Sequence, residues 1–516
     1  MEKRNLLKKN LLIYFLIFLG GPLVSFGEEL SELERKNFVR KCFAQLSGER
    51  IPRNSEYLQR VLTEDPAVLC MEILERASFQ SNGQIKEEEK SSVGQLVLKN
   101  MNRLHSTFFS SRRINGFGIP TRRASKNYFD QQQPAFYITN TLFNNLTYKN
   151  AVTRSTALKA VRSDNDPKFT IWDERYSYDT CETKNDTTKD CGRFLPKVIM
   201  TDLGMDKLYT NSSCKENPDQ EICKQYKVGY ALMPLAPRGK LYGLVSHTGV
   251  NVPEMTVSYQ GSTIFHEDHT NLVENQGGGI LGDTVYLQSN ISIPSREYKA
   301  DGSAQVSRNW AKAVYEDLLC RNLPALRSED VQFQISNLDG SSAFRWSSAC
   351  LRCHVGMDQT AGAVRNLQWV LSGSNFDGGE VTISPRLKEH TISNSEAWVE
   401  TPDANWHEKS PFSRLYYRDY KGDLIHRSAE DLNALGDIIG ETDDYYICAA
   451  KRYYKHFMKV DVSLADPGRQ PEEVTGSEHK AEVIRLGLDF KEHRSLKKLI
   501  EGIFKSKFYY SGKSNG

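Results

Sequence analysis

The residues best suited to do chemistry in this chain are two cysteines and a histidine in the segment Cys350-Leu351-Arg352-Cys353-His354. The spacing C-x-x-C-H is typical of the covalent attachment of c-type haem. Each thiol can add to one vinyl group of the porphyrin, and the adjacent imidazole can then bind the iron. We therefore expect Cys350 and Cys353 to hold haem c covalently and His354 to be an axial ligand of the haem iron.

Other chemistries also use a C-x-x-C pair, and they remain alternatives. A thioredoxin-type redox motif follows a strand and begins a helix in a βαβ unit. A structural zinc site needs a second pair of cysteine or histidine ligands at a matching spacing, and the sequence shows no such pair. A simple disulfide is the third alternative. Haem attachment is the favoured hypothesis.

The second axial ligand decides what a haem can do, because a Met or His ligand favours electron transfer, whereas an open position permits peroxide or oxygen chemistry. Met458 and His456 are our candidates for this distal position. Met357 follows His354 by only three residues and would project from the same side of the iron. Arg352 and Arg365 are candidates to pair with the haem propionates. The other histidines considered are His390, His407 and His426.

The N-terminus predicts export. A basic segment that contains Lys3 and Arg4 precedes an apolar run from Leu11 to Val24, and Ser25-Phe26-Gly27 supplies small residues for cleavage. The run is shorter than the roughly 20 residues that a membrane span needs, and no later stretch is long and apolar enough. We therefore expect a cleaved signal peptide at about residues 1–27 and a secreted protein of the periplasm that is not an integral membrane protein.

Composition restricts the class of protein further. The chain has 516 residues and a formal net charge of +2. Proteins that bind nucleic acid usually carry a strong positive charge, so no nucleic-acid partner is expected. Its 24 Tyr and 23 Phe, together with a mean hydropathy of −0.54, indicate a globular protein with a polar surface and an aromatic interior.

Periodicity predicts the elements that must position the motif. Helical spacing of apolar residues is clear from Glu28, fades between about Ile114 and Tyr298, and returns near Gln305, where Trp310, Val314 and Leu318 line one face. The expected fold is mainly α, with an inserted mixed α/β, loop-rich region and a c-type haem module near the C-terminal third. The expected divisions are a signal peptide (1–27), an N-terminal helical region (28–112), a mixed α/β disulfide-containing region (113–298), a cytochrome c-like haem module (299–400) and a C-terminal helical module (401–516).

Eight cysteines lie outside the haem motif. Cys42 and Cys70 are expected to bond across an N-terminal helical hairpin, and Cys181–Cys191 and Cys214–Cys223 to form local disulfides in polar loops. Cys320 and Cys448 then have no near neighbours in sequence. We predict that they bond to each other, with two buried free thiols as the alternative.

The order of segments resembles a family, the secreted bacterial cytochrome c proteins often called planctomycete-type. The resemblance is carried by Gly278-Gly279-Ile280-Leu281, by a helix that starts near Arg308 and ends in Leu318-Leu319-Cys320, and by the stretch from Cys350 to Met357-Asp358. It covers roughly residues 277–508 and departs from the family at Gln359–Gly362, where a proline and a glycine are usual. The resemblance implies haem and secretion, without defining a reaction.

Three functions follow as hypotheses. The first is a periplasmic c-type haem protein that transfers electrons with a redox partner protein of the cell envelope. The second is a haem-dependent enzyme of peroxidase or oxidase type, which would need an open distal site. The third is a disulfide-stapled envelope binding protein without haem. The first is favoured, and the sequence leaves open whether the protein is an enzyme.

Overall fold

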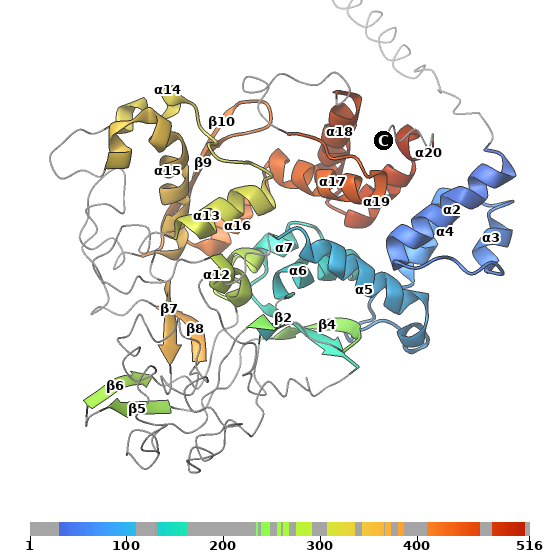
Figure 1. The fold of residues 1–516 in the computed structure, drawn as a ribbon, viewed down its shortest axis with the longest axis horizontal. Coiled ribbons are helices and arrows are strands. Elements are labelled where there is room, and N and C mark those ends of the chain that lie inside the picture. Colours follow the sequence, from blue (N-terminus) through green and yellow to red (C-terminus); the bar gives the residue numbers. More distant parts are fainter. Residues whose placement is uncertain are drawn as a thin grey trace, which may run out of the picture.

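The computed structural model describes a mostly helical protein in which short strands form two-stranded sheets, in agreement with the predominance of helix expected from the sequence (Figure 1). The described residues are 30–109, 129–130, 132–163, 234–235, 239–247, 255–259, 262–267, 275–290, 307–335, 343–365, 367–372, 380–385, 410–464 and 477–510.

The N-terminal region is a group of helices with locally encoded ends. Ser31 and Glu34 form a capping box at the start of the first helix, which ends at Gly48 in a left-handed conformation. Asp65 caps the third helix, and Pro66 is its first residue, as the sequence predicts. The helices are α2 (Glu32–Ser47), α3 (Glu56–Arg60), α4 (Pro66–Glu75), the 3-10 turn η1 (Glu87–Ser91) and α5 (Val93–Ser106).

The middle region combines helices with short strands. Strand β2 pairs antiparallel with β4, β5 pairs antiparallel with β6, and β1 pairs parallel with β3. The predicted disulfides Cys181–Cys191 and Cys214–Cys223 lie outside the described residues. The elements are β1 (Phe129–Asp130), α6 (Gln133–Phe143), α7 (Asn150–Thr153), β2 (Ala157–Arg162), β3 (Pro234–Leu235), β4 (Leu241–His247), β5 (Met255–Tyr259), β6 (Ser262–Glu267), η4 (Gly279–Gly282) and α12 (Thr284–Asn290).

The C-x-x-C-H motif lies in the next group of elements, on a helix of fourteen residues. An earlier helix of this group continues into a π-helical turn, and Trp310, Val314 and Leu318, which the sequence predicts on one apolar face, are all buried. The elements are α13 (Arg308–Ala313), the π-helical turn η5 (Val314–Leu318), α14 (Ser328–Val331), η6 (Gln332–Gln334), η7 (Ala343–Trp346), α15 (Ser348–Ala361), η8 (Gly362–Val364), and the antiparallel strands β7 (Leu367–Ser372) and β8 (Glu380–Pro385).

The C-terminal region begins with an antiparallel hairpin and continues as helices. Thr442 and Ser495 cap two of these helices, and both caps follow from the sequence pattern. The elements are β9 (Ser413–Arg418), β10 (Leu424–Ala429), α16 (Leu432–Ile439), α17 (Asp443–Met458), α18 (Ser477–His493), α19 (Leu496–Phe504) and α20 (Lys507–Tyr510).

One large apolar core joins the first and the last of the described helices. Phe38 of α2 packs edge-on against Tyr509 of α20 with ring centroids 4.7 Å apart, and the same core includes Trp310 and Tyr453. Two disulfides, Cys42–Cys70 and Cys320–Cys448, lie among the described residues, and both are pairs that the sequence predicts. In the part of the chain that the structure describes, no helix has the length and apolar character needed to cross a membrane.

Candidate functional site

Helix α15 places the three motif residues on one face. Ser347 caps the helix by accepting a hydrogen bond of 3.2 Å from the amide of Ala349. Residues three and four apart are neighbours on a helix surface, so Cys350, Cys353 and His354 lie side by side. Cys350 is exposed, and the other two are partly exposed. The motif therefore occupies the least covered side of its helix, which we call the motif face.

The other side of α15 is anchored in a small apolar cluster. Leu351 and Val355 are fully buried there. The other buried members of this cluster are Leu326, Val331 and Tyr416. Because the anchoring residues alternate with the motif residues, burying one side fixes the rotation of the helix and keeps the motif face toward the outside.

The second half of α15 lies close to strand β9. A Cβ atom on Gly356 would lie 2.9 Å from the carbonyl oxygen of Tyr416, so glycine permits this approach. The hydroxyl of Tyr315, from the π-helical turn, lies 2.8 Å from Oγ1 of Thr360. Burial raises the pKa of Tyr315 to about 12, so its hydroxyl is protonated at neutral pH. These contacts fix the position of α15 relative to η5 and β9.

The imidazole of His354 is neutral at physiological pH. Burial is the larger cause, and the positive charge of Arg308 the smaller cause, of a pKa lowered to about 4. A metal ligand must be the neutral imidazole, so His354 can bind a metal at neutral pH without first losing a proton.

A buried ion pair lies beside this histidine, and the sequence does not predict it. Arg308 donates from Nε to Oδ1 of Asp358 at 2.5 Å and from Nη2 to Oδ2 at 3.0 Å. Asp358 is fully buried, which raises the pKa of its carboxyl, while Arg308 and Arg345 act in the opposite direction. The one signal in the sequence is that Asp358 follows His354 by four residues, one turn along the helix.

The candidates for the distal position do not lie near His354. His456 is within 2.9 Å of the carbonyl oxygen of Gln45 in α2, and Met458 is buried in the large core at the end of α17. Helix α2 lies on the opposite side of the molecule from α15 (Figure 1). We therefore do not assign His456 or Met458 as a distal ligand.

The remaining candidates have other surroundings. His426 is exposed on β10, with its ring 4.8 Å from that of Tyr416. Arg352 and Arg365, the candidates for propionate pairing, donate hydrogen bonds to the carbonyl oxygens of Leu326 and Ser410. Met357 packs against the large core. His390 and His407 lie outside the described residues.

Taken together, the fold and the site define a mostly helical protein with two neighbouring thiols and a neutral imidazole on one outward helix face. Neither Cys350 nor Cys353 belongs to a disulfide. Across the described ranges, no group of three or more His, Cys, Asp and Glu side chains has the arrangement of a metal-ion site. No known family model, curated protein or solved structure matches the chain.

Proposed function

We propose that this chain is a periplasmic c-type haem protein that transfers electrons, with haem c attached to Cys350 and Cys353 and its iron bound by His354. The observation that carries the proposal is the motif face, on which both thiols and a neutral imidazole lie together. When bound there, haem would supply an iron centre that gains and loses one electron.

The chemistry of the donor residues fits this group. The four other cysteines among the described residues are disulfide-bonded, whereas Cys350 and Cys353 are not, so two thiols are available for thioether bonds. His354 needs no deprotonation to act as a ligand. The buried anchor of Leu351 on the other side of α15 would hold all three donors in a fixed orientation.

Exposure of the motif face favours electron transfer to another protein. Trp346, directly before the cap of α15, is 56% exposed, and Phe333 of η6 is 73% exposed. Exposed aromatic side chains are enriched where proteins dock. A redox partner protein of the envelope that docks against the exposed Cys350 would come close to a haem attached there, which would keep the distance for electron transfer short.

A periplasmic location has independent support. Disulfides persist in oxidising compartments, and the two disulfides of the described residues are compatible with one. The signal peptide expected at about residues 1–27 and the resemblance to secreted planctomycete-type cytochromes point the same way.

The test is a pyridine haemochrome measurement on protein made in a periplasm with c-type haem maturation. We expect a red protein whose haem survives acid–acetone extraction, and a Cys350→Ala/Cys353→Ala variant without haem. A Cys42→Ala/Cys70→Ala variant is the matched control, because it loses the same number of cysteines but keeps the motif. A colourless wild-type protein would contradict the proposal and favour a disulfide-stapled binding protein without haem.

A further inference from the structure

The segment from Arg308 to Arg321 connects the motif helix to α17. At its first end, the Arg308 side chain pairs with Asp358 of α15. At its other end, Cys320 is disulfide-bonded to Cys448 in the middle of α17, with the two Cα atoms 5.2 Å apart. Both ends of the segment are therefore fixed to other helices.

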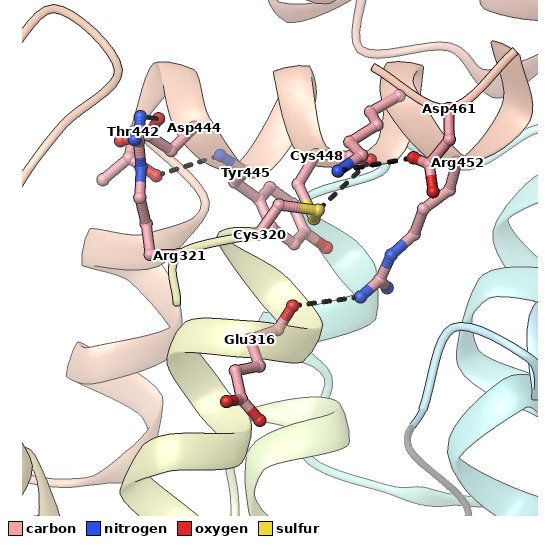
Figure 2. Close-up of a disulfide and its surroundings, with 10 residues drawn as sticks. Glu316, Cys320, Arg321, Thr442, Asp444, Tyr445, Cys448, Arg452 and Asp461 are labelled. Carbon is pink, nitrogen blue, oxygen red and sulfur yellow. Dashed lines mark hydrogen bonds and ion pairs between the residues drawn. A yellow bond between two sulfur atoms is a disulfide. The ribbon is translucent and has the colours of Figure 1, made fainter. Parts of the chain in front are cut away.

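Figure 2 shows two further contacts around this disulfide. Arg321 pairs with the buried carboxylate of Asp444 at 2.5 Å, and Arg452 donates a hydrogen bond of 3.2 Å to the carbonyl oxygen of Glu316. Asp444 also accepts a hydrogen bond from Tyr417. The segment is thus held along its length, so the position of Arg308 beside the motif helix is set by the protein interior.

The charges of Arg308 and Asp358 are both withdrawn from water. The side chain of Arg308 is 14% exposed, and that of Asp358 is fully buried. Interactions of buried charges are much less screened than those at the surface. Arg308 already acts on the imidazole of His354, and Asp358 stands one helical turn from it. An electron added near this imidazole would therefore interact with both charges.

We infer that Arg308 and Asp358 set the reduction potential of iron bound through His354, with Arg308 raising it and Asp358 lowering it. Reduction adds one negative charge at the iron, which a nearby cation stabilises and a nearby carboxylate destabilises. The two residues are positioning residues, because they act on the site without touching the iron. The inference rests on the proposed haem attachment.

The test is a potentiometric titration of haem-loaded wild-type protein and of three variants. Arg308→Gln removes the cation beside the site, so its potential should fall. Asp358→Asn leaves the guanidinium unopposed, so its potential should rise. The double variant removes both charges and should lie between the two single variants. Lys312→Gln is the matched control, because Lys312 is on the same helix, is 42% exposed and is screened by solvent, and its potential should not change.

Haem content, measured first, separates the two proposals. A wild-type protein without haem contradicts the proposed function, and the inference falls with it. Wild-type protein with haem, combined with single variants that leave the potential unchanged or shift it in the same direction, overturns the inference alone. If Arg308→Gln does not fold, the Asp358→Asn variant still tests the inference through the direction in which its reduction potential changes. A higher potential supports the inference, and an unchanged or lower potential contradicts it.

Discussion

The hydroxyl of Tyr315 lies 2.8 Å from Oγ1 of Thr360 and 3.3 Å from the carbonyl oxygen of Gly356, so one phenol joins the π-helical turn to the motif helix. It also accepts a hydrogen bond of 3.4 Å from the backbone amide of Tyr416 in β9. π-helical turns are rare and frequently occur at functional sites. In this protein the turn brings a buried tyrosine to the point where η5, α15 and β9 meet.

Replacing Tyr315 with Phe should lower the free energy of unfolding by about 1 to 3 kcal/mol, because the buried Tyr416 amide would lose the phenol oxygen as acceptor. Thr360 would also lose the phenol, although it would keep its hydrogen bond to the carbonyl oxygen of Arg414. Urea unfolding measures the loss. Tyr416→Phe is the control, since its hydroxyl makes one hydrogen bond among the described residues, to the carbonyl oxygen of Asp330. A Tyr315→Phe protein as stable as the wild type would show that the phenol does not join these elements.

The two disulfides should contribute unequally to stability. Cys320 and Cys448 are 128 positions apart in sequence, and Cys42 and Cys70 are 28 apart. The chain-entropy model then predicts stabilisation of about 5 kcal/mol for the first disulfide and about 3.5 kcal/mol for the second. Unfolding of the two double Cys→Ala variants measures the difference. A greater loss from Cys42→Ala/Cys70→Ala would contradict the order.

Local signals predict much of the fold, because caps need only neighbouring residues. Thr442, Ser495 and Asp65-Pro66 mark helix starts that the structure contains. The π-helical turn from Val314 to Leu318 is different. The apolar spacing there fits an ordinary helix, and the turn accompanies contacts of Tyr315 with α15 and β9, which lie far away in sequence and leave no local pattern.

The candidate site likewise combines features that neighbouring residues predict with contacts between residues far apart in sequence. The shared face of Cys350, Cys353 and His354 follows from their spacing alone. Arg308 lies 50 positions before its partner Asp358, so no local pattern in the sequence predicts this ion pair. The Cys320–Cys448 disulfide joins residues that are even farther apart, at 128 positions, but pairing the other cysteines with near neighbours predicts it by elimination.

Acid should destabilise the protein through His105. This imidazole is fully buried, with Nδ1 2.7 Å from the hydroxyl of Thr139 and Nε2 2.6 Å from that of Tyr453. Burial is the main cause of its pKa, lowered to about 3. The unfolded chain binds a proton below its ordinary pKa of about 6.5, whereas the folded protein does not. The neutral, buried His105 therefore makes its full contribution to the free energy of unfolding above pH 6.5, and this contribution is lost progressively as the pH falls toward 3.

The expected loss from His105 is about 2 kcal/mol of unfolding free energy between pH 7.5 and pH 5. Urea unfolding at the two pH values measures it, with His105→Gln as the comparison. The variant is less stable at pH 7.5, but its stability should fall by about 2 kcal/mol less over this interval. Equal pH dependence of the two proteins would exclude His105 as the source.

Gly279 should not tolerate a side chain, because it lies where η4 packs on α7. Its φ is +56°, and a Cβ atom there would lie 2.2 Å from the carbonyl oxygen of Ala151. Gly279→Ala should therefore lose about 2 to 4 kcal/mol of unfolding free energy, from the left-handed backbone and from the displacement of α7. Gly502→Ala is the control, because Gly502 is within α19 and its nearest neighbour is the end of the Leu486 side chain at 3.1 Å. Alanine's higher helix propensity should keep that change within about 1 kcal/mol. If both variants unfold at the same urea concentration, the close packing of Gly279 against α7 does not matter for stability.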